Sequence, residues 1–192
     1  MAQTAEEITV ALSGKVYVAP YTTGLVLPTD MAAPDAAFLD LGYTTEDGVT
    51  FAANPTVEDI RAWQKQTPVR RIVTERDSMV SFSLLQTNLD TFALAFGGGE
   101  WTTSGVDPDF VYRYDPPADA DALAEYAVII DFADGARNSR IVTRRATMND
   151  GVETQLVRNS AMVLPITLNA LTPDDEDSSW FMLSDDPSYS AA

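Results

Sequence analysis

Two pairs of aspartates have the residue type and spacing that acid–base catalysis could use. Asp107 and Asp109 form one pair, and Asp119 and Asp121 form the other. Two carboxylates that flank a glycosidic bond can cleave it in a glycoside hydrolase. Both pairs lie in proline-containing connectors, and nothing in their spacing indicates that the carboxylates face each other. A hydrolase that uses carboxylates alone stays a formal alternative, but we expect no catalytic residues and no enzyme.

Most other catalytic and metal sites are excluded by composition. The 192-residue chain has no histidine and no cysteine, so it lacks Ser-His-Asp and Cys-His nucleophiles, zinc sites built from these residues and disulfides. The acidic run Asp174–Asp177 lacks the spaced oxygens and glycine turn of a calcium loop. The glycine run Gly97–Gly99 follows an expected helix and indicates its end. We predict no cofactor and no metal ion.

The three tryptophans support an alternative function. Trp63, Trp101 and Trp180 could be sugar platforms in a carbohydrate-binding or adhesive β-sandwich module. Tryptophan is also common in cores and as an anchor of protein interfaces. We favour core or interface positions, with Trp63 as a candidate assembly residue.

The charge balance disfavours direct binding of nucleic acid. The chain has 12 basic and 29 acidic residues, a formal net charge of −17, and such a surface repels phosphates over about 8 Å at physiological salt. No stretch approaches the ~20 apolar residues of a membrane span, and the N-terminus lacks the features of a secretion signal. We expect a protein that is made in a cytoplasm and does not enter a membrane.

Arginines cluster in two segments despite the acidic total. The candidate assembly residues among them are Arg70, Arg71, Arg144 and Arg145. On a regular strand, the adjacent Arg144 and Arg145 face opposite sides of the sheet, so one of them is expected to meet something other than the open surface of its own domain. Pairing with carboxylates across subunits is one interpretation, and ordinary surface charge is the other.

Most elements that must position these residues are predicted to be strands. Five short strands are expected: Ile8–Leu12, Lys15–Ala19, Val49–Ala53, Met79–Leu85 and Phe110–Tyr114. Ser13 and Gly14 are expected to form a turn between the first two. Two hairpins are expected, one joining Tyr126–Phe132 to Arg140–Met148 through Asp134-Gly135, and one joining Glu153–Val157 to Met162–Leu168. Pro165 has no N–H, which indicates an edge position or a bulge.

One strand and one helix supply the predicted core. Along Met79–Leu85, apolar and serine residues alternate, so the apolar set is expected in the core with two residues of a neighbouring strand: Val80, Phe82 and Leu84 with Val49 and Phe51. Asn88 can cap a helix whose apolar stripe contains Leu89, Phe92, Ala93 and Phe96. We expect Phe92 and Phe96 to pack on the sheet.

The stretch 57–66 has two interpretations. A capping sequence at Thr56 would start a short helix with Val57, Ile60 and Trp63 on one side. The same stretch could be an extended arm. Altogether the chain predicts a mostly β fold with one short flanking helix and long connecting arms, in which residues 1–171 form one domain with an N-terminal arm and residues 172–192 form an acidic C-terminal arm.

Three segments resemble a known family. These are VALSGKVYVAP (10–20), LGYTTEDGVTF (41–51) and the stretch 57–100, in which "DI-AWQ", "TPVR", an alternating strand, a short helix and a glycine run follow in order. Together they resemble the major tail tube proteins of siphophages, particularly those that infect actinobacteria. The resemblance covers roughly residues 8–170.

The resemblance implies a fold and an assembly. It implies a β-sandwich or open barrel, hexameric rings that stack into the hollow tube of a virion tail, and genomic DNA that passes through during ejection. It also implies contacts with the tape measure, tail terminator and tip proteins. Because an acidic wall does not hold DNA, we expect a net negative lumen. The connector 20–40, the segment 54–70 and the end beyond residue 172 are expected to become ordered on assembly.

Overall fold

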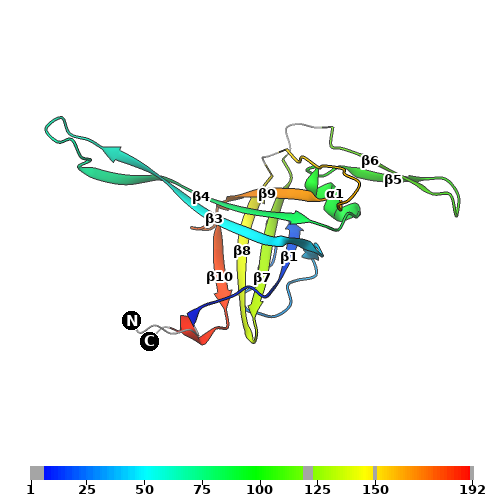
Figure 1. Cartoon of the computed structure of the whole chain (residues 1–192), viewed down its shortest axis with the longest axis horizontal. Coiled ribbons are helices and arrows are strands. Elements are labelled where there is room, and N and C mark those ends of the chain that lie inside the picture. The colour runs from blue at the N-terminus through cyan, green and yellow to red at the C-terminus, as the bar shows by residue number, and fades with distance from the viewer. Residues whose placement is uncertain (1–6, 119–122, 149–150, 191–192) are drawn as a thin grey trace.

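The fold is built on one large antiparallel sheet with a separate hairpin beside it (Figure 1). The structure, a computed structural model, describes residues 7–118, 123–148 and 151–190. The main sheet has eight strands in the order β2-β1-β7-β8-β9-β4-β3, with β10 also pairing with β8. Its strands are β1 (Ser13–Pro20), β2 (Leu39–Asp40), β3 (Thr44–Ile60), β4 (Arg70–Leu84), β7 (Glu125–Asp134), β8 (Arg137–Thr147), β9 (Leu164–Leu171) and β10 (Trp180–Ser184).

Three further elements complete the described chain. The separate hairpin consists of β5 (Glu100–Ser104) and β6 (Val111–Asp115). A short α-helix, α1 (Leu89–Ala95), lies against β9, and a 3₁₀ helix, η2 (Pro187–Tyr189), follows β10. The predominance of strands and the presence of one α-helix among the described residues confirm the predicted mostly β fold.

The core lies where the main sheet folds over on itself. Figure 1 shows β3, β4 and β9 crossing over β1, β7 and β8, as in a sandwich or an open barrel. The facing side chains of both layers form one apolar cluster, which includes Val16, Val18, Val80, Phe82, Leu84, Val128, Ile130, Leu164, Ile166 and Leu168. Val49 and Phe51 pack against this cluster from β3. The alternation in β4 therefore predicted the face that Val80, Phe82 and Leu84 bury.

A second apolar cluster covers the opposite face of β1, β7 and β8. Ala19, Ala127, Ile129 and Val142 form a second buried cluster there with Phe38. Leu25 and Leu27, from the long connector between β1 and β2, pack on it, and so does Phe181 of β10. The apolar island in the C-terminal segment is thus a strand of the main sheet, and the connector 21–38 is a covering layer.

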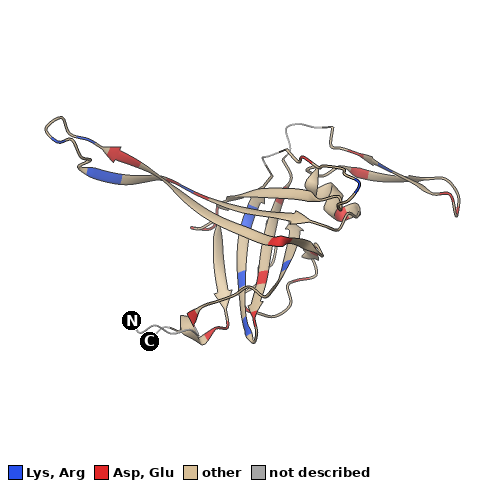
Figure 2. Cartoon of the chain, in the orientation of Figure 1, with Lys and Arg blue, Asp and Glu red and all other residues tan. Residues whose placement is uncertain are grey.

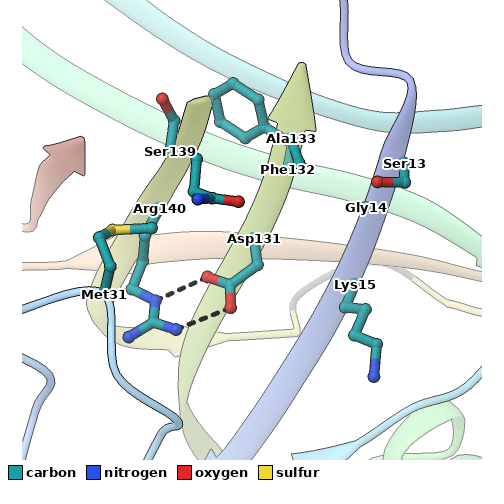
Figure 3. A pocket seen from close by; sticks show the side chains of 10 residues that line it. Ser13, Gly14, Lys15, Met31, Asp131, Phe132, Ala133, Ser139 and Arg140 are labelled. Atoms are coloured by element: carbon teal, nitrogen blue, oxygen red, sulfur yellow. Dashed lines mark hydrogen bonds and ion pairs between the residues drawn. The ribbon is translucent and has the colours of Figure 1, made fainter. Parts of the chain in front are cut away.

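A buried ion pair ties this connector to the sheet. Arg140 of β8 has 2% of its side chain exposed. Its Nε and one terminal nitrogen donate to the two carboxylate oxygens of Asp131, at 2.6 and 2.7 Å (Figure 3). Its other terminal nitrogen donates to the carbonyl oxygens of Asp30 and Ala32, at 3.0 and 2.8 Å. One guanidinium therefore joins two strands to the connector.

Of two predicted turns, one forms and the other does not. A tight turn joins β7 to β8 as predicted, but its two residues are Gly135 and Ala136, because Asp134 still pairs with Arg137 in the ladder. Gly135 has a positive φ of 64°, which glycine adopts readily. Ser13 and Gly14, in contrast, lie inside β1, which pairs with β7, and Ile8–Leu12 is not a strand. Ser13 and Gly14 form strand and not a turn, because the pairing of β1 with β7 continues without interruption from Ser13 to Pro20.

The expected second hairpin does not form. Glu153–Val157 is a loop, and β9 pairs with β4 and with the end of β8. Pro165 lies where β9 pairs with β4 alone, because the β8 ladder covers only Asn169–Leu171. At Pro165, β9 therefore has a paired strand on one side only, which agrees with the predicted edge position.

The helix buries a different stripe from the predicted one. Asn88 caps it as predicted, through hydrogen bonds to the N–H groups of Asp90 and Thr91. Its buried residues are Thr91, Leu94 and Ala95. Phe92 and Phe96 do not pack on the main sheet. They meet the aromatic rings of the β5–β6 hairpin, because that hairpin offers the helix an aromatic partner that the sequence pattern did not reveal.

Two phenylalanines allow a matched test of this core. We expect Phe82→Ala to lower the free energy of unfolding by about 3–5 kcal/mol, because Phe82 is 5% exposed and its removal leaves a cavity. Phe96 is 38% exposed, so Phe96→Ala should cost less than about 2 kcal/mol. Urea unfolding of both variants measures the difference. Equal losses would contradict this placement of the two rings.

Candidate assembly surfaces

The β3–β4 hairpin extends far beyond the rest of the main sheet (Figure 1). We call residues 54–77 the arm and residues 60–74 its outer part. The arm pairs from Asn54↔Asp77 to Ile60↔Arg70, with one shift of register between Thr56 and Val57, and no residue from 53 to 77 is buried. A helix from Thr56 is therefore wrong, and the extended interpretation of 57–66 is correct for the part up to Ile60. The residues from Thr56 to Ile60 form a strand and not a helix because they pair with β4.

The arm exposes apolar side chains that have no contact with a core. Trp63 at the end of the hairpin is 99% exposed. Val57 and Val73 form a cross-strand pair, and each is about half exposed, as are Ile60 and Val69 nearby. Tryptophan is enriched among the residues that dominate binding energy at protein interfaces. The arm therefore has the composition of a surface that another molecule covers.

The outer part of the arm has the opposite charge to the whole chain. It contains Arg61, Lys65, Arg70 and Arg71 and no acidic residue, whereas the net charge of the chain is −17. Figure 2 shows these basic positions in the projecting hairpin. Arg71 donates two hydrogen bonds to Asp59, at 2.7 and 3.3 Å, and these hold the pKa of the Asp59 carboxyl below its usual range. Within the described residues, Arg70 has no ion-pair partner.

The β5–β6 hairpin is a second projection, fixed at its base by aromatic rings. Phe92 of α1 lies 5.0 Å from the ring of Tyr114 and 5.5 Å from that of Trp101. The Tyr114 hydroxyl donates to the carbonyl oxygen of Gly98, and burial raises the pKa of this hydroxyl. Farther out, the hairpin exposes the apolar residues Val106, Phe110, Val111 and Tyr112. This hairpin is thus a second candidate contact surface.

Arg144 and Arg145 lie on the same side of the sheet, so the prediction that they face opposite sides is wrong. The register of β7 and β8 shifts between Tyr126 and Val128, so the two arginines together lie opposite Ala127. A β-bulge of this kind breaks the regular alternation. Each of the two arginines lines a hollow together with Tyr21.

Both of these arginines pair with carboxylates of their own chain. Arg144 donates to Glu176 at 2.6 Å, and its guanidinium lies 4.7 Å from the ring of Phe181. Arg145 makes two hydrogen bonds to Glu125, at 2.8 and 2.5 Å, which raise its pKa. The bulge thus fastens the segment after β9 and the start of β7 to one face of β8.

The bulge makes a prediction about charge reversal. We expect Arg144→Glu and Arg145→Glu to lower the free energy of unfolding by similar amounts, about 1–3 kcal/mol each, because each places a carboxylate beside another carboxylate. Arg158→Glu, on an exposed loop, is the control and should change stability by less than about 0.5 kcal/mol. Chemical denaturation measures all three. A large loss in only one of the two bulge variants would contradict their shared environment.

The described residues do not form a catalytic or metal-binding group at the other candidate positions. Asp107 and Asp109 are exposed, and Asp119 and Asp121 lie outside the described residues. Within the described part of the chain, no group of three or more acidic residues could hold a metal ion, and no helix is long and apolar enough to cross a membrane. Gly97 and Gly98 end α1 as predicted, donating to the carbonyl oxygens of Leu94 and Ala93.

The remaining tryptophans are not exposed platforms. Trp101 belongs to the aromatic cluster beside α1, and Trp180 makes an edge contact with Phe51 at 4.7 Å. Both are partly buried. Only Trp63, among the three, presents its whole ring to solvent. Trp63 is therefore the tryptophan whose ring is available for contact with another molecule.

Comparison with known proteins gives one match. A family model described as "Phage tail tube protein" matches residues 1–192. No curated protein matches the chain. The matched range includes both projecting hairpins and the C-terminal strand β10.

Proposed function

Because the chain belongs to the phage tail tube protein family, and is therefore a structural component of a bacteriophage tail, we propose that it forms hexameric rings that stack into the hollow tube of a long non-contractile tail. The tail would be that of a siphophage of the type that infects actinobacteria. The observation that supports this most directly is the arm, whose exposed Trp63 and valine pair need a partner surface. Repeated contacts between identical copies close rings or extend filaments.

The tube would conduct genomic DNA during ejection without binding it. Its lumen carries a net negative charge, since a lumen lined with unpaired arginines would bind phosphates and release their counterions. Several arginines are already paired with carboxylates within the chain, including Arg71, Arg140, Arg144 and Arg145. This pairing leaves little basic charge for the lumen and supports the proposal.

The proposal also assigns partners and a place of synthesis. The tape measure protein would occupy the lumen before ejection, and terminator and tip proteins would cap the two ends of the tube. The chain would be made in the cytoplasm of the host bacterium and would act without a cofactor and without catalysis.

Electron microscopy of the purified protein tests the proposal. Rings and stacked tubes are expected, and a reconstruction of the tube should show more Asp and Glu than Lys and Arg on the lumen wall. Monomers that stay monomeric at high concentration and bind glycans through Trp63 would instead support the carbohydrate-binding alternative. A net positive lumen would overturn the proposed route for DNA even if the tube forms.

A further inference from the structure

An apolar hollow opens into the core at the side of the sheet where β1 approaches β3. Its volume is about 290 Å³. Its apolar lining comes from strands of both layers and comprises Val16, Val49, Phe51, Ile130, Phe132 and Ile141. Two charged residues, Lys15 and Asp131, also line it, and each forms an ion pair with another residue of the chain. Ala11 is the first residue of the lining in chain order. A cavity of ~150 Å³ accepts a benzene ring, so this hollow has room for an indole.

Acidic residues border the hollow. Thr44 and Gly48 both line it, and between them β3 departs from its regular pairing with β4. Glu46 and Asp47 lie in this irregular stretch, and both are exposed. Within the described residues, neither carboxylate forms an ion pair. The hollow therefore combines an apolar interior with two unpaired carboxylates beside it, because the charged residues of the lining itself form ion pairs.

The outer part of the arm has the complementary pattern. An exposed aromatic ring, Trp63, lies between Arg61 and Lys65, and Arg70 follows on the returning strand. The arm leads away from the body of its own chain (Figure 1), so Trp63 and the hollow of one molecule are far apart. Two copies with a net charge of −17 each repel one another, and the outer part of the arm is the surface that can attract an acidic rim.

We propose that Trp63 of one copy enters this hollow on a neighbouring copy, while the basic side chains around it face Glu46 and Asp47. The inference rests on the proposed tube, since stacked copies would supply the neighbour, and it names the receiving site. The burial of the indole supplies a central anchor, and the charged residues around it supply orientation.

A chain without cysteine allows this contact to be tested by site-directed cross-linking. Gln64→Cys and Ala11→Cys place one thiol beside Trp63 and one at the hollow, and both native residues are exposed. Treatment of assembled double variant with a short bismaleimide should give covalent dimers and higher oligomers. The two single variants, and Gln64→Cys paired with Ser188→Cys on the exposed η2 helix, should remain mainly monomeric on denaturing gels.

A second set of variants tests whether the indole itself is bound. In the variant that carries both Gln64→Cys and Ala11→Cys, the further change Trp63→Ala should reduce cross-linking at least about tenfold. Trp63→Phe should keep most of the cross-linking. Leu156→Ala, which removes another exposed apolar side chain, is the matched control and should have no effect. Replacement of Glu46 and Asp47 together by lysine should weaken cross-linking, and added salt should then raise cross-linking, because it screens the repulsion between the new lysines and the basic arm.

Microscopy of the same samples separates the two proposals. Tubes without cross-linked oligomers would overturn the Trp63 contact and leave the tube standing. Cross-linked oligomers without rings or tubes would support the contact and contradict the proposed function. Cross-linking that is as strong in the Trp63→Ala variant as in its parent would also overturn the contact. The absence of both tubes and cross-linked oligomers would reject both proposals.

Discussion

Replacement of Arg140 by alanine should lower the free energy of unfolding by about 3–5 kcal/mol. Arg140 is almost completely buried, and its guanidinium donates to Asp131 and to the carbonyl oxygens of Asp30 and Ala32. Its removal leaves the Asp131 carboxylate in a partly buried place without its counter-charge. The hydrogen bonds that Arg140 donates to Asp131 also raise the pKa of Arg140, so the guanidinium keeps its charge.

An exposed ion pair provides the control for this variant. Arg113 pairs with Asp115 at 2.6 Å on the β5–β6 hairpin, where 74% of its side chain is exposed. Arg113→Ala should cost less than about 1 kcal/mol. Urea denaturation compares the two variants, and hydrogen exchange should show faster exchange in the connector 21–38 for Arg140→Ala. A loss below ~1 kcal/mol for Arg140→Ala would mean that the connector is not held by this guanidinium.

Removal of the arm should abolish tube formation while leaving the domain folded. Asn54 and Asp77 are paired in the β3–β4 ladder, so residues 55–76 can be replaced by Asn-Gly, which favours a two-residue hairpin turn. No residue of the arm is buried, so the free energy of unfolding of the monomer should change by less than about 1 kcal/mol. Electron microscopy should find no tubes under conditions in which the parent protein assembles.

The separation of folding from assembly is the decisive part of this result. A point variant, Arg158→Ala, serves as the assembly control because Arg158 lies on an exposed loop outside both projecting hairpins. Tubes formed in normal yield by the arm-deleted protein would exclude the arm from assembly. An unfolded deletion variant would show that the arm stabilises the body, although none of its residues is buried.

The sequence predicted the elements whose signals are local. The turn that contains Gly135, the cap at Asn88 and the alternation of Val80, Phe82 and Leu84 each depend on a few neighbouring residues. The cap and the alternation have their expected places, and the turn lies one residue later than expected. The positive φ required at Gly135 is one example, because a glycine there is a direct consequence of backbone sterics.

The features that the sequence did not predict depend on distant partners. The bulge at Arg144 and Arg145 arises where β8 changes its outer neighbour from β10 to β9, and neither neighbour is encoded near these residues. The stripe of Phe92 faces the β5–β6 hairpin for the same reason. Thr56–Ile60 adopts strand geometry because β4 pairs with it, although its local sequence also suits a helix start.

The position of β3 at the end of the strand order has a further consequence for solubility. An edge strand of 17 residues offers unpaired backbone groups that could recruit strands of any other chain into amyloid-like aggregates. β3 interrupts this edge with Pro55, which has no N–H, and with irregular pairing near Glu46 and between Thr56 and Val57. Charged residues along the strand add repulsion between edges. These features protect the exposed edge of β3 from disordered strand addition.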